Sequence, residues 1–386
     1  MIGHNLLKKK QFIKVLYVDF EKAFDKVSVQ KLLHKLNGFG VTGNIFECIK
    51  SFLTNRRQSV RIASVQSSFQ QVISGVPQGS VLGPFLFLLF INDLPDIFDN
   101  SVSAKLFADD LKAYDIFNTL EDGDKIQSAL NNLIEWSNKW QLNLSVSKCG
   151  SLLVVGKSSF EDTHKLTVNG DTLNIFHSTK DLGVFIDSHL SFSEHISGII
   201  SKANQRIYLL LKTFRNRSIK LMIFAFKVYI LPLLEYCSPV WSPFKLNDVD
   251  RIEKVQRSFT KKLEGLKTLT YSERLVACEL PSLELRRLRA DLLLCFKIVH
   301  NLIAIDFNDF FELEQSQYNT RGHKFKLRIP KIHNTLRKNF FSVRILPVWN
   351  YLSSEIVSSS CCASFKMQLL SVDLSKFLLR KYDSFD

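Results

Sequence analysis

Short apolar runs alternate with helical patterns over the first half of the chain. The β-branched run VLYVDF at residues 15–20 is typical of a buried strand. Apolar residues at helical spacing follow it and predict a helix directly after the strand: Phe24, Val27, Leu32 and Leu36. Further strands are predicted at 58–73, 151–155, 166–176 (a hairpin turning at Asn169–Gly170) and 181–187, and further helices at 81–97 and 125–142. This mixture predicts an α+β fold.

The second half of the chain predicts helices almost throughout. From about residue 193 the strand patterns stop, and apolar residues recur at helical spacing over 195–214, 219–236 and 248–263. A Pro-rich stretch, SPVWSPF, separates the second of these helices from the third. We therefore expect boundaries near residues 188–193 and 242–247, which divide the chain into 1–190, 191–245 and 246–386.

Three aspartates are candidates for one site. Asp19 ends the predicted buried strand, and Asp109 and Asp110 lie at the tip of a hairpin predicted over residues 104–114. If the two strands are neighbours, the carboxylates converge, and clustered carboxylates either raise a pKa or bind a cation such as Mg²⁺. Taken singly, an Asp after a strand is more typical of a helix cap and an Asp-Asp pair of a turn. Both sites adjoin buried runs, where an unpaired carboxylate is costly, and this favours the joint site.

A glycine-rich loop, GVPQGS at residues 75–80, precedes the helix predicted at 81–97. Gly75 and Gly79 permit close approach to the backbone, and Gln78 offers both a donor and an acceptor. A loop of this composition is also typical of an ordinary turn. Phe24, five residues after Asp19, is on its own typical of a core residue.

The charge is unevenly distributed. The chain has 386 residues, enough for two or three domains, and a formal net charge of +14. Residues 1–200 hold 20 basic and 20 acidic residues, so the whole excess lies after residue 200. A basic region of this kind indicates a polyanionic partner, nucleic acid or less often an anionic membrane; a solvated basic surface is the alternative.

Cysteine usage and the N-terminal sequence exclude several classes. The seven cysteines include no CxxC pair, which argues against a disulfide framework and against a zinc knuckle. The start, MIGHNLLKKKQF, has no apolar core of a secretory signal. The longest apolar run, Val81–Ile91, is shorter than the ~20 residues of a membrane span. We expect a soluble, reduced, intracellular protein without membrane contact.

Taken in order, five segments resemble the motifs of a reverse transcriptase palm. They are residues 15–27 (motif A), 74–95 (motif B), 104–114 with FADD (motif C), 141–149 (motif D) and 181–187 (primer grip). The AFDKV, FINDLP and FADD sequences are similar to those of jockey-like non-LTR retrotransposons. Residues 255–275, 280–300 and 337–352 resemble the C-terminal region of such elements. The resemblance extends from about Val15 to Phe377.

The resemblance implies a right-hand polymerase fold and an activity. Residues 1–190 would form the palm, an antiparallel sheet with packed helices of the split βαβ type, followed by a helical thumb at 191–245 and a basic, mostly helical region at 246–386. The implied activity is RNA-directed DNA polymerisation by two-metal nucleotidyl transfer from a dNTP to a primer 3′-OH. The implied partners are an RNA template, a DNA primer and dNTPs, the implied cofactors are two Mg²⁺ ions (or Mn²⁺), and the implied compartment is the nucleus.

The resemblance also implies roles for individual residues. Asp19, Asp109 and Asp110 match the metal-binding carboxylates, and the Phe20 carbonyl is a further candidate ligand. Phe24 matches the steric gate, whose ring would collide with a ribose 2′-OH. The remaining matches are Lys22 and Ala23 (backbone contacts to the triphosphate), Gln78 and Gly79 (nucleotide and template contacts), Lys148 (proton donor to pyrophosphate, or else a solvated lysine), and Leu182 and Gly183 (primer grip).

One departure from the family pattern bears on activity. In the family a long fingers region precedes motif A and carries basic residues that hold the triphosphate. Here 14 residues precede Val15, and Lys8, Lys9 and Lys10 are a poor substitute. No upstream endonuclease or C-terminal CCHC motif is matched either. We therefore expect a truncated copy that binds nucleic acid and polymerises feebly or not at all, since positioning dominates phosphoryl transfer.

Two other functions remain open from the sequence. The first is a non-catalytic nucleic-acid-binding remnant that uses basic residues of the predicted thumb: Lys202, Arg206, Lys212, Arg215 and Arg217. The second is an RNA-dependent RNA polymerase, which fits less well because Phe24 and FADD at 107–110 are rare in such enzymes.

Overall fold

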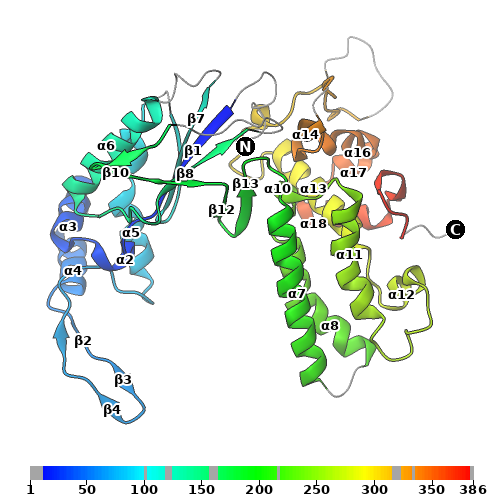
Figure 1. Ribbon diagram of the computed structural model, residues 1–386, viewed down its shortest axis with the longest axis horizontal. Coiled ribbons are helices and arrows are strands. Elements are labelled where there is room, and N and C mark those ends of the chain that lie inside the picture. The colour runs from blue at the N-terminus through cyan, green and yellow to red at the C-terminus, as the bar shows by residue number, and fades with distance from the viewer. Residues whose placement is uncertain are drawn as a thin grey trace. The chain divides into compact units, whose positions relative to one another are not determined.

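The computed structural model describes residues 12–99, 102–117, 124–155, 164–214, 218–314, 323–332 and 335–382, which divide into two compact units (Figure 1). The N-terminal unit ends at Thr179, and the C-terminal unit begins at Lys180. Lys8, Lys9, Lys10, Arg215 and Arg217 lie outside the described residues. The three-part division expected from the sequence stays a prediction.

A five-stranded sheet forms the centre of the N-terminal unit, in the order β11-β8-β1-β7-β6. Strand β1 (Phe12–Val18) lies between β7 (Asp110–Phe117) and β8 (Gly150–Val154) and is antiparallel to both. Strand β6 (Ser103–Phe107) extends the sheet beyond β7. The α+β class is confirmed, and the buried run of β1 accounts for its central place.

The sheet is mixed rather than fully antiparallel. The short strand β11 (Asn174–Phe176) pairs in parallel with β8. Parallel neighbours need a crossover of about a dozen residues or more, and the connection from β8 to β11 is long enough to supply it. Part of that connection is the small hairpin of β9 (Thr167–Val168) and β10 (Asp171–Thr172), which turns at Asn169–Gly170 as predicted.

Helices pack against the sheet through one hydrophobic core. Leu16 and Val18 of β1 contact apolar side chains of α3 (Val29–Gly38), α5 (Leu82–Ile91) and α6 (Asp124–Trp140). The helix that follows α3 is α4 (Gly43–Leu53), and the four appear together beside the sheet in Figure 1. Helix α5 is apolar on nearly every side, and its Leu86, Phe87 and Phe90 are fully buried.

Two predicted helices of the N-terminal unit are interrupted, as is the helix predicted over 219–236, which forms two separate helices, Ile219–Tyr229 and Leu231–Glu235. The helix expected after β1 is split into α2 (Ala23–Lys26) and α3, because Val27 and Ser28 adopt extended backbone angles. The helix expected over residues 81–97 ends at Ile91 and continues as the 3₁₀ helix η1 (Leu94–Ile97), where Pro95 lacks the backbone donor that an α-helix needs.

The strands expected over residues 58–73 form a narrow exposed ribbon. Four two-residue strands pair as β2 with β5 and β3 with β4, and the ribbon projects from the unit in Figure 1. Their bounds are Arg57–Gln58, Arg61–Ile62, Val65–Gln66 and Gln70–Gln71. All eight residues are exposed, so this ribbon adds nothing to the core.

Residues 181–187 form part of a hairpin rather than the single strand predicted. Strand β12 (Ser178–Asp181) pairs with β13 (Val184–Asp187) through a two-residue turn, Leu182–Gly183. Both turn residues have positive φ, which glycine accepts and leucine rarely adopts, and the pattern therefore hid the turn.

The C-terminal unit is helical, as predicted. Its longer helices are α7 (Ser193–Thr213), α8 (Ile219–Tyr229), α11 (Leu246–Thr260) and α13 (Leu283–Val299). The shorter ones are α9 (Leu231–Glu235), α10 (Ser238–Trp241), α12 (Tyr271–Ala277), η3 (Phe307–Asp309), α14 (Thr335–Lys338), α15 (Phe341–Arg344), α16 (Leu346–Tyr351), α17 (Ser354–Val357), α18 (Cys362–Gln368), η4 (Leu369–Ser371) and η5 (Ser375–Phe377). No helix in the described ranges is both long and apolar enough to cross a bilayer.

Two hydrophobic cores hold this unit together. One joins α7, α8 and α11, with Phe226 stacked on Phe259 at 4.6 Å between ring centroids. The other surrounds α13, where Phe296 stacks on Phe365 of α18 at 4.3 Å. Arg344 of α15 links to α13 through the carboxylate of Asp291, which is 2% exposed.

A buried histidine makes the C-terminal unit sensitive to acid. His195 is 4% exposed, and its Nδ1 accepts a hydrogen bond from the Phe185 backbone at 3.4 Å. Burial, aided by the charge of Lys202, lowers the pKa of His195 to about 4. The unfolded chain therefore binds a proton more readily than the folded chain between about pH 6.5 and pH 4.

We expect the unfolding free energy to fall by up to about 3 kcal/mol as pH drops across this window because of His195 alone. Denaturant unfolding of the wild type and of His195→Gln at pH 7, 5.5 and 4 measures this effect. The wild type should lose more stability on acidification than the variant, because the variant lacks the titrating ring. Equal losses in both proteins would contradict the assignment.

Candidate active site

The strand register brings two of the three predicted aspartates to the same end of the sheet. Val18 pairs with Leu111 at the last step between β1 and β7. Asp19 directly follows Val18, and Asp110 directly precedes Leu111 as the first residue of β7. Continuing the antiparallel register by one residue sets Asp19 across from Asp110.

Asp109 lies in the turn of the β6–β7 hairpin. Phe107 pairs with Asp110, so the turn consists of Ala108 and Asp109, and Ala108 has a φ of 51°. The sequence placed both aspartates at the tip, whereas the structure places Asp109 in the turn and Asp110 in the strand. The tight turn keeps Asp109 next to Asp110 and at the same end of β7.

The donor set is chemically suited to a hard cation. The two neighbouring strand ends present carboxylate oxygens, which Mg²⁺ and Mn²⁺ prefer over nitrogen or sulfur ligands. Within the described ranges, no group of three or more His, Cys, Asp or Glu side chains is arranged to hold a metal ion. Asp19, Asp109 and Asp110 therefore do not form a three-carboxylate metal site in this structure, and a cation held by their oxygens would take its remaining ligands from water and substrate phosphates, as Mg²⁺ commonly does.

Phe20 directly follows Asp19, and its carbonyl takes no part in the hydrogen bonds of the neighbouring β-bridge. Phe20 forms an isolated antiparallel bridge with Leu144. The hydrogen bonds of this bridge run from the Ser145 amide to the Asp19 carbonyl (2.8 Å) and from the Glu21 amide to the Asn143 carbonyl (2.9 Å). The bridge therefore does not use the Phe20 carbonyl, whose role as a metal ligand stays a prediction.

Lys148 contacts Asp19 directly. Its Nζ lies 3.2 Å from Asp19 Oδ1, and the two side chains are 66% and 40% exposed. The residues that carry Lys148 form a turn, in which the Lys148 and Cys149 amides both donate to the Ser145 carbonyl, at 2.9 and 3.0 Å. The structure thus joins two residues that are 129 positions apart in the chain.

Cys149 is a neighbour of Asp19 that sequence reasoning missed. Its Sγ accepts a hydrogen bond from the Asp19 amide at 3.4 Å, and the thiol donates to the Asp19 carbonyl at 3.6 Å. Burial raises the pKa of the Cys149 thiol, which keeps it protonated and able to donate. Only its place directly after Lys148 marked it in the sequence.

The gate candidate packs against helix α5. Lys22 adopts a left-handed conformation (φ 46°) where α2 begins, and Ala23 behind it is buried. Phe24 is half-buried, and its ring stacks on Phe87 with centroids 4.2 Å apart and an interplanar angle of 21°. This stacking holds the ring against the core, as expected for a core residue, whereas the role of Phe24 as a gate stays a prediction.

The glycine loop lies against the backbone of α2. The Val76 amide donates to the Phe24 carbonyl at 2.9 Å, and the Gly75 amide donates to the Val27 carbonyl at 2.8 Å. Gly75 has a φ of 84°, and a Cβ there would lie 2.7 Å from the Asp25 carbonyl oxygen. Glycine is therefore required at position 75 for the loop to approach the gate.

Asp25 fixes the predicted nucleotide contact Gln78. The Gln78 Nε2 donates to Asp25 Oδ1 at 2.7 Å, and the Ser74 hydroxyl donates to the Asp25 carbonyl at 2.8 Å. Gly79, the next residue, has a φ of 77° and open space where a side chain would stand. Sequence reasoning missed Asp25, although its carboxylate is the only charged group within the AFD triplet.

The two primer-grip candidates belong to the C-terminal unit. Leu182 and Gly183 form the β12–β13 turn, and the Leu182 carbonyl accepts a hydrogen bond from the Tyr236 hydroxyl at 2.9 Å. A Cβ on Gly183 would lie 3.2 Å from the Tyr236 ring. Tyr236 therefore fixes the shape of this turn.

Part of the predicted basic face is present on α7. Lys202, Arg206 and Lys212 are exposed, and the first two are one helical turn apart on the same side. Arg206 also donates to the Tyr229 carbonyl of α8 at 3.3 Å. These residues give α7 a positive surface that a phosphate backbone could contact.

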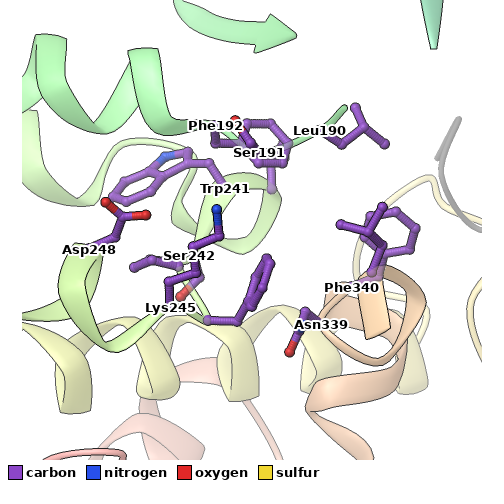
Figure 2. A pocket seen from close by; sticks show the side chains of 13 residues that line it. Leu190, Ser191, Phe192, Trp241, Ser242, Lys245, Asp248, Asn339 and Phe340 are labelled. Atoms are coloured by element: carbon purple, nitrogen blue, oxygen red, sulfur yellow. The ribbon is translucent and has the colours of Figure 1, made fainter. Parts of the chain in front are cut away.

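The C-terminal unit also contains a narrow pocket away from these residues (Figure 2). Rings of Phe192, Trp241 and Phe340 form much of its wall, and Lys245 and Asp248 are its charged residues. Asp248 forms an ion pair with Arg251 at 3.0 Å. None of the residues predicted to act in catalysis lines this pocket.

Comparisons with known proteins agree with these features. Residues 3–186 match the family described as reverse transcriptase (RNA-dependent DNA polymerase). The chain is 30% identical over 269 residues to the RNA-directed DNA polymerase from mobile element jockey of Drosophila funebris, covering 67% of this chain and 29% of that protein. It is 27% identical over 264 residues to the probable RNA-directed DNA polymerase from transposon X-element of Drosophila melanogaster, covering 66% and 29%.

The match spans less than a third of the length of these relatives. Among solved structures, telomerase from Candida albicans in complex with a TWJ fragment of telomeric RNA covers 70% of this chain and 42% of its own, at 14% identity and a TM-score of 0.41. Residues 3–186 thus match the reverse transcriptase family, and the chain is similar to the RNA-directed DNA polymerases of non-LTR retrotransposons.

Proposed function

We propose that the chain is an RNA-directed DNA polymerase that extends a DNA primer on an RNA template with dNTPs. The observation that carries the proposal is the β1–β7 register, which sets Asp19 across from Asp110 with Asp109 in the adjoining turn. Reverse transcriptases use divalent metal ions. Two Mg²⁺ ions, or Mn²⁺, would be held by the three aspartates and the Phe20 carbonyl and would stabilise charge on the attacking and leaving oxygens.

The surrounding residues would position the nucleotide. The Lys22 and Ala23 amides at the start of α2 would face the triphosphate, and the Phe24 ring beside them would exclude a 2′-OH. Gln78 and Gly79 would contact the nucleotide and template from the loop that Asp25 holds. Lys148 would give a proton to the leaving pyrophosphate, acting as a general acid. Leu182 and Gly183 would contact the primer strand.

Primer extension tests the proposal. The purified chain is incubated with poly(rA)/oligo(dT), dTTP and Mg²⁺, with and without EDTA. Incorporation that requires the divalent ion supports the polymerase, even at the low rate that the sequence leads us to expect. Retained binding of the duplex without any incorporation would favour the second candidate, a nucleic-acid-binding remnant.

The remnant is favoured by one observation, the exposed basic side chains of α7. Binding through such residues releases counterions from the phosphates, so its affinity falls steeply as salt rises. Measuring the affinity for the duplex between about 50 and 200 mM salt tests this, because the loss of affinity is large over that range. Both candidate functions predict binding of the duplex, but only the polymerase predicts incorporation of dTTP.

The gate assignment predicts altered sugar selectivity in Phe24→Val. Removing the ring opens the space that a ribose 2′-OH would enter, and we expect the preference for dTTP over UTP to fall by about tenfold or more, or some 1.4 kcal/mol of discrimination. Single-nucleotide incorporation with each substrate measures the ratio. Phe24→Tyr, which keeps the ring, is the matched control and should retain the preference. An unchanged ratio in an active Phe24→Val protein would remove the gate role.

A further inference from the structure

We propose that Lys148 is the counter-ion of Asp19 in the metal-free protein and must leave that carboxylate for a divalent cation to bind. This inference rests on the proposed function, in which Asp19 is a metal ligand. It adds a second role to Lys148, which changes partner between the metal-free and the loaded site. The two roles predict opposite effects of one substitution on metal affinity and on turnover.

The contact itself is the first step of the argument. Lys148 Nζ lies 3.2 Å from Asp19 Oδ1, within ion-pair distance and on an oxygen that a metal ion would use. An ammonium and a divalent cation cannot share this oxygen without repulsion, because both are positive and both would lie within a few ångströms of it. The two therefore compete for Asp19.

Hydrogen bonds around Lys148 hold its backbone next to Asp19, so the ion pair does not depend on the two side chains alone. The Ser145 amide donates to the Asp19 carbonyl at 2.8 Å, and the Cys149 thiol contacts both the amide and the carbonyl of Asp19. These bonds attach the whole turn of residues 145–149 to the backbone of Asp19. The backbone of Lys148 is thus held beside the carboxylate, and only its flexible side chain can move.

Exposure shows that the ion pair can open. Lys148 is 66% exposed and Asp19 is 40% exposed, so water can solvate both charges as they separate. Exposed pairs contribute little to stability, so a metal ion displaces the ammonium at small cost. The released side chain stays tethered next to the site, where a bound triphosphate would offer it new oxygens.

Metal binding by the free chain, without nucleic acid or nucleotide, tests the inference. The affinity for Mn²⁺ is measured by electron paramagnetic resonance at low salt for the wild type, Lys148→Met, Lys148→Arg and Asp19→Asn. We expect Lys148→Met to bind Mn²⁺ about three- to tenfold more tightly than the wild type, since an adjacent positive charge is removed. Lys148→Arg keeps that charge and should bind within about twofold of the wild type. Asp19→Asn should bind most weakly.

The outcomes separate this inference from the polymerase proposal. Tighter Mn²⁺ binding by Lys148→Met supports the counter-ion role, including the case in which the wild type binds too weakly to detect. Equal or weaker binding by Lys148→Met, or no binding by any variant, overturns it. Primer extension by the same proteins is a separate readout: a wild type that extends no primer refutes the polymerase, while the Mn²⁺ affinities still decide the role of Lys148. Since Lys148 is largely exposed, circular dichroism should show all variants folded.

Discussion

Asp109→Ala is expected to abolish primer extension, lowering dTTP incorporation by at least about a thousandfold, or some 4 kcal/mol of transition-state stabilisation. Asp109 occupies the β6–β7 turn, next to the strand end where the register sets Asp19 across from Asp110. In the proposed site the Asp109 carboxylate would help to hold a divalent cation, so its removal would weaken the cation's stabilisation of charge on the phosphate oxygens. The measurement is the rate of dTTP incorporation on poly(rA)/oligo(dT) with Mg²⁺.

The control for this substitution is Asp171→Ala. Asp171 is exposed in β10, so its removal takes away one surface carboxylate without touching the β1–β7 end of the sheet. It should retain incorporation close to the wild-type rate. An Asp109→Ala protein that keeps a tenth or more of the wild-type activity would contradict the metal-ligand role of Asp109.

Arg344→Met is expected to destabilise the C-terminal unit by about 3–5 kcal/mol. Arg344 donates to both carboxylate oxygens of Asp291, at 2.9 and 3.0 Å, and also to the carbonyls of Asn339 and Pro239. Asp291 is 2% exposed, so the variant leaves a buried carboxylate without its main cation. Denaturant unfolding, followed by circular dichroism, measures the loss.

The pH dependence of this loss has a defined sign. Burial raises the pKa of Asp291 even with Arg344 in place, and removing the cation raises it further. The folded variant then binds a proton more readily than the unfolded chain, so its stability falls as pH rises above about 4, the pKa of an unfolded Asp. The deficit should be smaller at pH 5 than at pH 8. The double variant Arg344→Met with Asp291→Leu removes both charges and should recover part of the loss; a double variant no better than Arg344→Met would contradict this explanation.

The sequence predicted those strands and turns that are determined by residues close together in the chain. The apolar run at β1 and the hairpin around Asp109 and Asp110 were both readable, since alternation and a turn-forming pair lie within a few residues of each other. The break between α2 and α3 was not readable, because Val27 and Ser28 carry no glycine or proline signal. The turn at Leu182–Gly183 was missed for a different reason: it contains a glycine, but leucine seldom adopts the positive φ that Leu182 has here.

Contacts between distant segments limited what could be predicted about the site. The three aspartates could be proposed together from their flanking strands, but nothing local places the Cys149 thiol on the backbone of Asp19, 130 residues earlier. The same applies to the hydrogen bond from Gln78 to Asp25. Such pairs depend on the strand order β8-β1-β7 and on the loop that crosses α2, which the sequence pattern does not specify.

The close approach of Gly75 to the Asp25 backbone excludes any other residue at position 75 without a local rearrangement. Even the smallest side chain at position 75 would push into the peptide that carries the gate, since its Cβ would meet three backbone atoms of Asp25 within 2.9 Å. A substitution at this codon would therefore force the loop or the Asp25 peptide, directly after Phe24, out of its present position. If Phe24 acts as the proposed gate, a side chain at position 75 would disturb the peptide next to it and so alter the choice of sugar.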